Sequence, residues 1–379
     1  MSYENVVVLV PGFFGFGRLG SFYYFADRVA ACLRGAAQVA FGAPTPVLGV
    51  ATVPTGSLAE RQAFLLSKLT HADRTLRKPA RYHLVGHSAG GLDAELLRAQ
   101  APLRHGTWSN LDPEGVRARI STITTISSPH YGTYLANGGV AGLLGNPLHH
   151  LAAIPEASAV ALQIAKLAIE RPVLHEAFYA GAQAWSDSAR FLVSLLTDEE
   201  LAKDLRTDSM EQTRHEHPPA LRVPVTCFVT AIPKNPVFVE SETHQREPRR
   251  PDELIVSLER LTAHVEGTLP GAADKNLQDL NSNPSPLIRN PVAEIPDFEP
   301  STNDGVVNAM TQILRTEGAR FGGLVMADHG DVIGHYDRTD PLTNGAPIND
   351  GVFRSGSGFG DDQFFALYSE VAKAFHARL

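Results

Sequence analysis

The feature that most constrains this chain is a G-x-S-x-G pentapeptide, Gly86 to Gly90, which lies between a β-prone run and a helical pattern. Tyr82 to Val85 precede it, and apolar residues at positions 92, 94, 96 and 97 follow at spacings that can line one face of a helix. A turn from a buried strand into a helix is so tight that glycines are needed on both flanks, and it exposes the serine hydroxyl in a crevice. The N-terminus of that helix would stabilise an oxyanion there. The pattern therefore predicts a nucleophile at Ser88.

Length and composition exclude several classes of function. The chain has 379 residues, of which 43% are hydrophobic and 20% charged, enough for one large domain with insertions or for two domains. A net charge of -8 without a basic stripe argues against nucleic acid as a partner. Residues 1–10 lack the basic region and cleavage site of a signal peptide, and the apolar run Val6 to Val10 is too short to span a bilayer. We expect a protein without a transmembrane segment that is either cytoplasmic or has had its leader removed.

The chain has two cysteines, Cys32 in a helical pattern and Cys227 in a strand pattern. Two cysteines in such positions do not indicate a disulfide framework. We expect both to be buried thiols.

Runs of β-branched and apolar residues alternate with helical patterns along the chain, as is typical of parallel strands joined by right-handed crossovers. The expected strands are residues 6–10, 47–53, 82–85, 120–126, 223–230 and 320–326. A capping box at Ser57 to Glu60 begins a helix that is expected to continue to Arg77. The predicted fold class is α/β, with a mostly parallel central sheet flanked by helices in a single domain, 1–379.

Two segments interrupt this alternation. Residues 135–218 show Ala- and Leu-rich helical patterns and are predicted to form a helical insertion over the strand ends, either a mobile lid or a fixed cap. Residues 233–300 are rich in Pro, Asn and charge, and they are predicted to be an irregular insertion that forms a β-hairpin or a wall of the substrate cleft.

A second glycine motif, Gly15 to Gly20, spells G-x-G-x-x-G. A dinucleotide-binding fold needs an acidic residue at the end of the next strand, and residues 47–53 offer none. The stretch instead favours a role at the reaction site, where the backbone N–H of Phe13 would complement that of Ala89 in an oxyanion hole.

Two further aromatic side chains, Phe14 and Phe16, follow Phe13. They are candidates to line an acyl pocket, and the alternative is that they are ordinary core residues.

The acid and base of a serine hydrolase of this architecture follow the nucleophile in the order acid, then histidine. Asp304 lies in a turn between Asn303 and Gly305, whereas the competing Asp350 comes after every plausible base strand. His329 directly follows the last expected strand, and His335 is the alternative base. The predicted triad is therefore Ser88, Asp304 and His329.

Four motifs together resemble those of bacterial true lipases, and the last two look most like the larger Gram-positive branch of that family. They are Val85 to Asp93, Ile126 to Thr133, Asn303 to Asn308 and Asp328 to Gly334. The resemblance covers the core strands and their loops, and neither insertion matches. It implies an α/β-hydrolase that lacks the first antiparallel hairpin, a mobile helical lid, and hydrolysis of carboxyl esters, usually of lipids. One departure is Pro11-Gly12 where the family mostly has His-Gly, which keeps the backbone donor.

The resemblance also implies a structural Ca²⁺ near the catalytic histidine. Asp331 holds the position of one ligand, and Asp337 and Asp340 are candidates for others, although the family's Asp-Pro spacing is not reproduced. Hard oxygen ligands suit Ca²⁺, whereas a loop aspartate is usually only solvated. Paired Asp and His ligands for the Zn²⁺ of the Gram-positive branch cannot be located, and His215 and His217 without a third ligand are weak evidence for a metal.

The sequence thus predicts a lipase-like serine ester hydrolase. Within the enzyme class, the rivals are a short-chain esterase, a polyester depolymerase or an acyltransferase that uses the same triad. Outside it, the rival is a binding protein that has lost catalysis.

Overall fold

The structure, a computed structural model, describes residues 3–13, 18–19, 22–76, 78–100, 102–103, 105–106, 111, 113–137, 199–231, 302–340, 346–349 and 357–377. Six strands form the central sheet in the spatial order β4-β1-β5-β6-β7-β8, and all of their pairings are parallel. The strands are β1 (Glu4–Val10), β4 (Val47–Gly49), β5 (Ala80–His87), β6 (Ile120–Ile126), β7 (Val225–Ala231) and β8 (Ala319–Met326). The predicted α/β alternation and mostly parallel central sheet are confirmed.

Strand β4 is shorter than the predicted 47–53. Val50 N still donates to Leu9 O, but the carbonyls of Val53 and Pro54 then accept hydrogen bonds from the guanidinium of Arg61. Arg61 thus binds the chain where it has already left the sheet.

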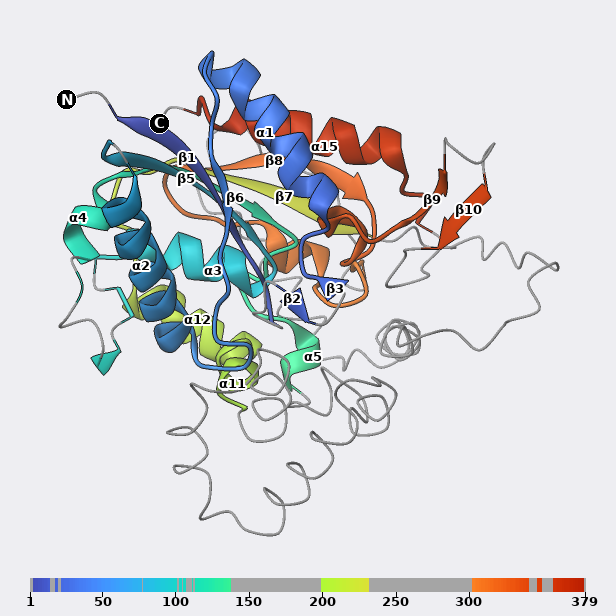
Figure 1. The fold of residues 1–379 in the computed structure, drawn as a ribbon. Coiled ribbons are helices and arrows are strands. Elements are labelled where there is room, and N and C mark those ends of the chain that lie inside the picture. The colour runs from blue at the N-terminus through green and yellow to red at the C-terminus, as the bar shows by residue number, and fades with distance from the viewer. Residues whose placement is uncertain are drawn as a thin grey trace, which may run out of the picture.

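Helices cover both faces of the sheet (Figure 1). Helices α1 (Asp27–Phe41) and α15 (Asp361–Ala374) lie together on one face, and α2 (Leu58–Thr75), α3 (Ala89–Glu95) and α4 (Pro113–Arg117) lie on the other. Helix α2 starts close to its predicted position, because the Ser57 hydroxyl caps it by accepting from Glu60 N at 3.2 Å.

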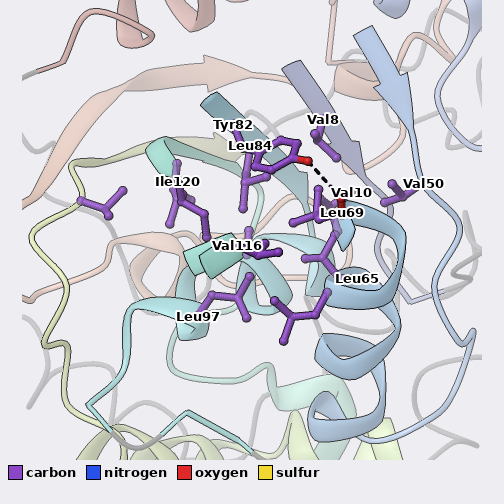
Figure 2. Close-up of a cluster of buried hydrophobic side chains, with 14 of the residues drawn as sticks. Val8, Val10, Val50, Leu65, Leu69, Tyr82, Leu84, Leu97, Val116 and Ile120 are labelled. Atoms are coloured by element: carbon purple, nitrogen blue, oxygen red, sulfur yellow. Dashed lines mark hydrogen bonds between the residues drawn. The ribbon is translucent and has the colours of Figure 1, made fainter. Parts of the chain in front are cut away.

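Alternate residues of β1 supply the two cores. Val6, Val8 and Val10 pack with α2, α3 and α4, whereas Val7 and Leu9 pack with α1 and α15. Figure 2 shows the first core, where the hydroxyl of Tyr82 lies 3.0 Å from Leu69 O and 2.6 Å from Asp73 Oδ1. This period of two is what a strand buried on both faces requires.

Shorter elements complete the described part of the chain. They are β2 (Arg18–Leu19), β3 (Phe22–Tyr23), η1 (Leu96–Arg98), α5 (Tyr134–Asn137), α11 (Glu200–Asp204), α12 (Thr207–Glu216), η6 (Ala309–Gln312), η7 (Asp331–Ile333), β9 (Asp337–Asp340) and β10 (Ala346–Asn349). Helices α5, α11 and α12 belong to the predicted insertion 135–218, and residues 138–198 of it lie outside the described residues. The predicted insertion 233–300 lies wholly outside them.

Of the two thiols, Cys227 is buried in β7 as predicted, but the prediction for Cys32 is wrong. Cys32 is only partly buried because it lies beside the stripe of Val29, Leu33 and Ala37 that α1 turns to the core. No helix in the described part of the chain combines the length and the apolar character needed to cross a bilayer.

Candidate active site

Ser88 lies at the junction of β5 and α3 with a left-handed backbone, φ 55° and ψ -133°. A non-glycine residue holds such a conformation only where the surrounding structure enforces it. The turn is tight because a Cβ on Gly86 would lie 2.4 Å from Gly90 O, and Ser88 N donates to Ile126 O at 2.9 Å. The serine is 5% exposed at the carboxyl edge of the sheet. The sequence therefore forms the tight strand-to-helix elbow that the pentapeptide predicts.

Asp304 and His329 are hydrogen-bonded partners. His329 Nδ1 lies 2.8 Å from Asp304 Oδ2, and His329 N donates to Asp304 O at 3.0 Å, so side chain and backbone are both fixed. The other carboxylate oxygen, Oδ1, accepts from the backbone N–H groups of Val306 and Val307 at 3.0 and 2.8 Å. Because an ionised carboxylate can only accept, His329 Nδ1 carries a proton and Nε2 is left as the basic nitrogen.

The histidine lies next to the elbow. The ring of His329 is 4.5 Å from the ring of His87, the residue that precedes Ser88. The three predicted triad residues are thus gathered at one edge of the sheet, although about 240 positions separate Ser88 from His329 in the chain.

The structure describes the alternative base, His335, but not the alternative acid, Asp350. His335 Nε2 donates to the carbonyl oxygens of Tyr23 and Tyr24 at 2.8 and 3.0 Å, so the ring ties its loop to β3. Asp350 lies outside the described residues.

The predicted oxyanion residues lie on either side of Ser88. Ala89 is the first residue of α3, and the Gly12–Phe13 segment packs against the elbow so closely that a Cβ on Gly12 would lie 2.6 Å from Ser88 Cβ. The Phe13 side chain is partly buried against the apolar cluster that includes Ala89. Phe14 and Phe16 lie outside the described residues.

One polar contact that the sequence analysis missed involves His87, the residue directly before the serine. Tyr24 Oη is 2.7 Å from His87 Nδ1, and both residues are buried. Burial, followed by the neighbouring imidazole of His329, lowers the pKa of His87 well below its usual value, so the ring of His87 is neutral. No sequence signal links these residues, because Tyr24 lies in an aromatic stretch and His87 fills the variable position of the motif.

A second missed feature is a fully buried ion pair under the Gly12–Phe13 segment. Arg61 of α2 and Asp93 of α3 are 0% exposed, and their Nη2–Oδ2 distance is 2.6 Å. The same Nη2 donates to Pro11 O at 2.9 Å. Arg61 therefore joins the helix that follows Ser88 to the segment that carries Phe13.

Of the three residues predicted to bind Ca²⁺, the structure describes the side chain of Asp331. Asp331 Oδ2 accepts hydrogen bonds from Asp328 N at 2.9 Å and from Ser357 Oγ at 2.7 Å, which makes this carboxylate a loop anchor. The side chains of Asp337 and Asp340 lie outside the described residues. No group of three or more His, Cys, Asp or Glu residues suited to a metal occurs among the residues that the structure describes. Since Ca²⁺ takes about 6–8 oxygen ligands, Asp331 alone does not form its site.

A serine with positive φ, between a parallel strand and a helix, thus lies next to a buried Asp–His pair at one edge of the sheet. Neither the family models nor the curated proteins contain a match to this chain. Solved structures similar to it include EstA from Clostridium botulinum, with 17% identity, a TM-score of 0.48, and coverage of 98% of this chain and 87% of that one. The Staphylococcus hyicus lipase has 14% identity, a TM-score of 0.48 and coverage of 98% and 94%. Lipase 1 from Pelosinus fermentans has 18% identity, a TM-score of 0.48 and coverage of 88% and 94%.

Proposed function

We propose that the protein is a lipase-like serine carboxyl-ester hydrolase. The observation that carries the proposal is the His329–Asp304 hydrogen bond of 2.8 Å, held next to a serine with φ 55°. Such a base, oriented by a third group, is the arrangement that activates a serine nucleophile. Acylglycerols or related lipid esters are the proposed substrates, in keeping with the motifs that resemble bacterial true lipases of the larger Gram-positive branch.

In the proposed mechanism, Ser88 Oγ attacks the ester carbonyl carbon while His329 Nε2 takes the hydroxyl proton. Asp304 holds the imidazole in the required tautomer and stabilises the imidazolium. The backbone N–H groups of Phe13 and Ala89 would bind the tetrahedral oxyanion, each contributing about 3 kcal/mol of transition-state stabilisation.

Collapse of that intermediate breaks the ester C–O bond and transfers the proton from His329 to the departing alcohol. The acyl group is then bonded to Ser88. Water attacks the acyl-enzyme with His329 again acting as base, which releases the carboxylic acid and restores the serine hydroxyl.

The insertion 135–218 is proposed to cover this site as a lid. Its described base is fixed to the core, because Arg214 of α12 forms an ion pair with Glu95 of α3 and donates to His130 O at 2.9 Å. We also propose that the fold lacks the first antiparallel hairpin of the α/β-hydrolases. In support, every described pairing of the six-stranded sheet is parallel.

The structural Ca²⁺ remains a separate prediction, and no step of the mechanism depends on it. If Asp337 and Asp340 complete a site with Asp331, the melting temperature in Ca²⁺ should exceed that in EDTA by several degrees, because a ligand that binds only the folded state stabilises it. Equal melting temperatures would remove the metal from the account.

The proposed function is tested with Ser88→Ala and a series of p-nitrophenyl esters from acetate to palmitate, with and without emulsified lipid. We expect wild-type turnover to rise towards long acyl chains and Ser88→Ala to lose turnover without a lower melting temperature. Preference for acetate would favour a short-chain esterase. Transfer of the acyl group to an added alcohol in preference to water would favour an acyltransferase, and retained turnover in Ser88→Ala would refute the proposal.

A further inference from the structure

The carboxylate of Asp304 has a side-chain partner besides His329. Thr230, at the end of β7, donates from Oγ1 to Asp304 Oδ2 at 2.6 Å, and both residues are 0% exposed. Oδ2 is also the atom that faces His329 Nδ1. The Thr230 hydroxyl and the His329 imidazole therefore bind the same carboxylate oxygen. The direction from which the hydroxyl approaches Oδ2 limits the directions from which the imidazole can approach it.

Gln312 of η6 holds Thr230 in place. Its Oε1 accepts from Thr230 N at 2.7 Å, and its Nε2 donates to Thr230 O at 3.0 Å and to Val307 O at 3.1 Å. These partners fix the amide orientation, since only the NH₂ group can face two carbonyl oxygens. Gln312 thus joins the end of β7 to the turn that carries Asp304.

Ser127 completes the arrangement from β6. Its Oγ lies 2.7 Å from Thr230 Oγ1. Thr230 has a single hydroxyl proton, and the charged acceptor at 2.6 Å holds it more strongly than Gln312 Oε1 at 3.2 Å. Ser127 must therefore donate to Thr230, and a chain of two hydroxyls ends on the carboxylate.

We propose that Thr230, held by Gln312 and Ser127, is a positioning residue that aims the Asp304 carboxylate at His329 during ester hydrolysis. This inference rests on the proposed function and deepens it. Because Thr230 is 0% exposed, a substrate cannot reach it, and its hydroxyl can influence the reaction only through Asp304. Loss of its hydroxyl would remove the 2.6 Å bond and leave Oδ2 with the longer contact to Gln312 Nε2 at 3.4 Å, and the imidazole would be misaligned as the proton moves.

The experiment compares Thr230→Val, which replaces the hydroxyl by a methyl group of similar size, with Thr230→Ser, which keeps the hydroxyl. For p-nitrophenyl butyrate, we expect Thr230→Val to lower kcat about tenfold with KM within about twofold of wild type, as for an interaction that matters in the transition state. Thr230→Ser should keep kcat within about twofold of wild type. Thr230→Ala is measured as well, because it removes the hydroxyl without placing a methyl group against the carboxylate. If the hydroxyl-free variants match Thr230→Ser, the inference is overturned.

A double-mutant cycle separates positioning from general support of the fold. In an Asp304→Asn background, Thr230→Val should lower the residual kcat less than about twofold, because the group it positions is already impaired. A further tenfold loss in that background would overturn the inference. Retained turnover in Ser88→Ala would instead refute the proposed function itself, so the two failures can be told apart.

Discussion

Two serines with nearly the same positive φ directly follow two neighbouring strands, and their surroundings differ. Ser88 ends β5 with φ 55° and Ser127 ends β6 with φ 53°, and they are the non-glycine residues with positive φ in the described part of the chain. Ser127 is 0% exposed, and its hydroxyl is bonded to Thr230. Ser88 is followed by α3 and lies next to the ring pair of His87 and His329.

The difference shows that strain at the end of a strand does not by itself identify a reactive serine. Ser88 lies beside the proposed base, whereas the hydroxyl of Ser127 belongs to the network around the proposed acid. The neighbouring elements decide the role, because they determine whether a base can reach the oxygen. In this account Ser88 reacts and Ser127 supports.

The largest effect is expected from removing the base that distinguishes the two serines. His329→Ala should lower kcat/KM roughly 10⁴-fold or more, since loss of a triad histidine removes the proton acceptor. His335→Ala is the matched control and should stay within about tenfold of wild type, because its ring binds backbone carbonyls of Tyr23 and Tyr24. Steady-state ester hydrolysis measures both variants, and the reverse order of effects would assign the base to His335.

The next largest effect is expected from the buried Arg61–Asp93 ion pair, which joins α3 to the Gly12–Phe13 segment. Arg61→Met should lower the free energy of unfolding by about 3–5 kcal/mol, because it leaves Asp93 as a buried charge without its partner. Arg206→Met is the control, since Arg206 and Asp208 form an exposed pair, and it should cost no more than about 1 kcal/mol. Urea denaturation measures both, and equal costs would contradict the structural role of the buried pair.

A smaller effect, on the pH dependence of stability, is expected from the buried His130, which follows Ser127 closely in the chain. Nε2 of His130 lies 3.0 Å from Thr125 Oγ1, and Nδ1 accepts from Arg214 at 3.2 Å. Burial, followed by the charge of Arg214, lowers the pKa of His130 to about 3. The unfolded chain therefore binds a proton near its ordinary pKa of about 6.5 while the folded protein does not.

Stability should consequently fall as the pH drops below about 6.5 and continue to fall until the pH reaches the folded pKa. Between pH 7 and pH 5 this group alone should cost about 2 kcal/mol. His130→Gln should flatten that dependence, as measured by urea denaturation at several pH values. An unchanged slope would mean that His130 is protonated in the folded protein.

The smallest effect is expected from the contact between Tyr24 and His87. Tyr24→Phe removes the hydroxyl that lies 2.7 Å from His87 Nδ1, and should lower the free energy of unfolding by about 1–2 kcal/mol. Tyr23→Phe is a control because Tyr23 is exposed. Thermal melting compares them, and a loss of less than a few tenths of a kcal/mol for Tyr24→Phe would show that the contact is dispensable.

The central sheet could be predicted from the sequence because strands buried on both faces are written as continuous apolar runs, such as Val6 to Val10. The pairing of Asp304 with His329 could be predicted because His329 follows the end of β8, and Asp304 lies in an Asn-Asp-Gly turn that precedes it in the chain. Sequence alone could not predict the roles of Arg61, Thr230 and Gln312. Each is a single polar residue on an otherwise ordinary helix or strand, and its meaning comes from partners far away in the chain. The burial of Cys32 was predicted wrongly for a related reason, because it depends on where the buried stripe of α1 ends.

The most direct test of the account is to treat the protein with a fluorophosphonate, digest it and locate the adduct by mass spectrometry. The account predicts one phosphonate on Ser88, none on Ser127 or Ser128, and no labelling in His329→Ala. An adduct on another serine, or labelling that does not depend on His329, would contradict the claim that Ser88 is the nucleophile and His329 its base.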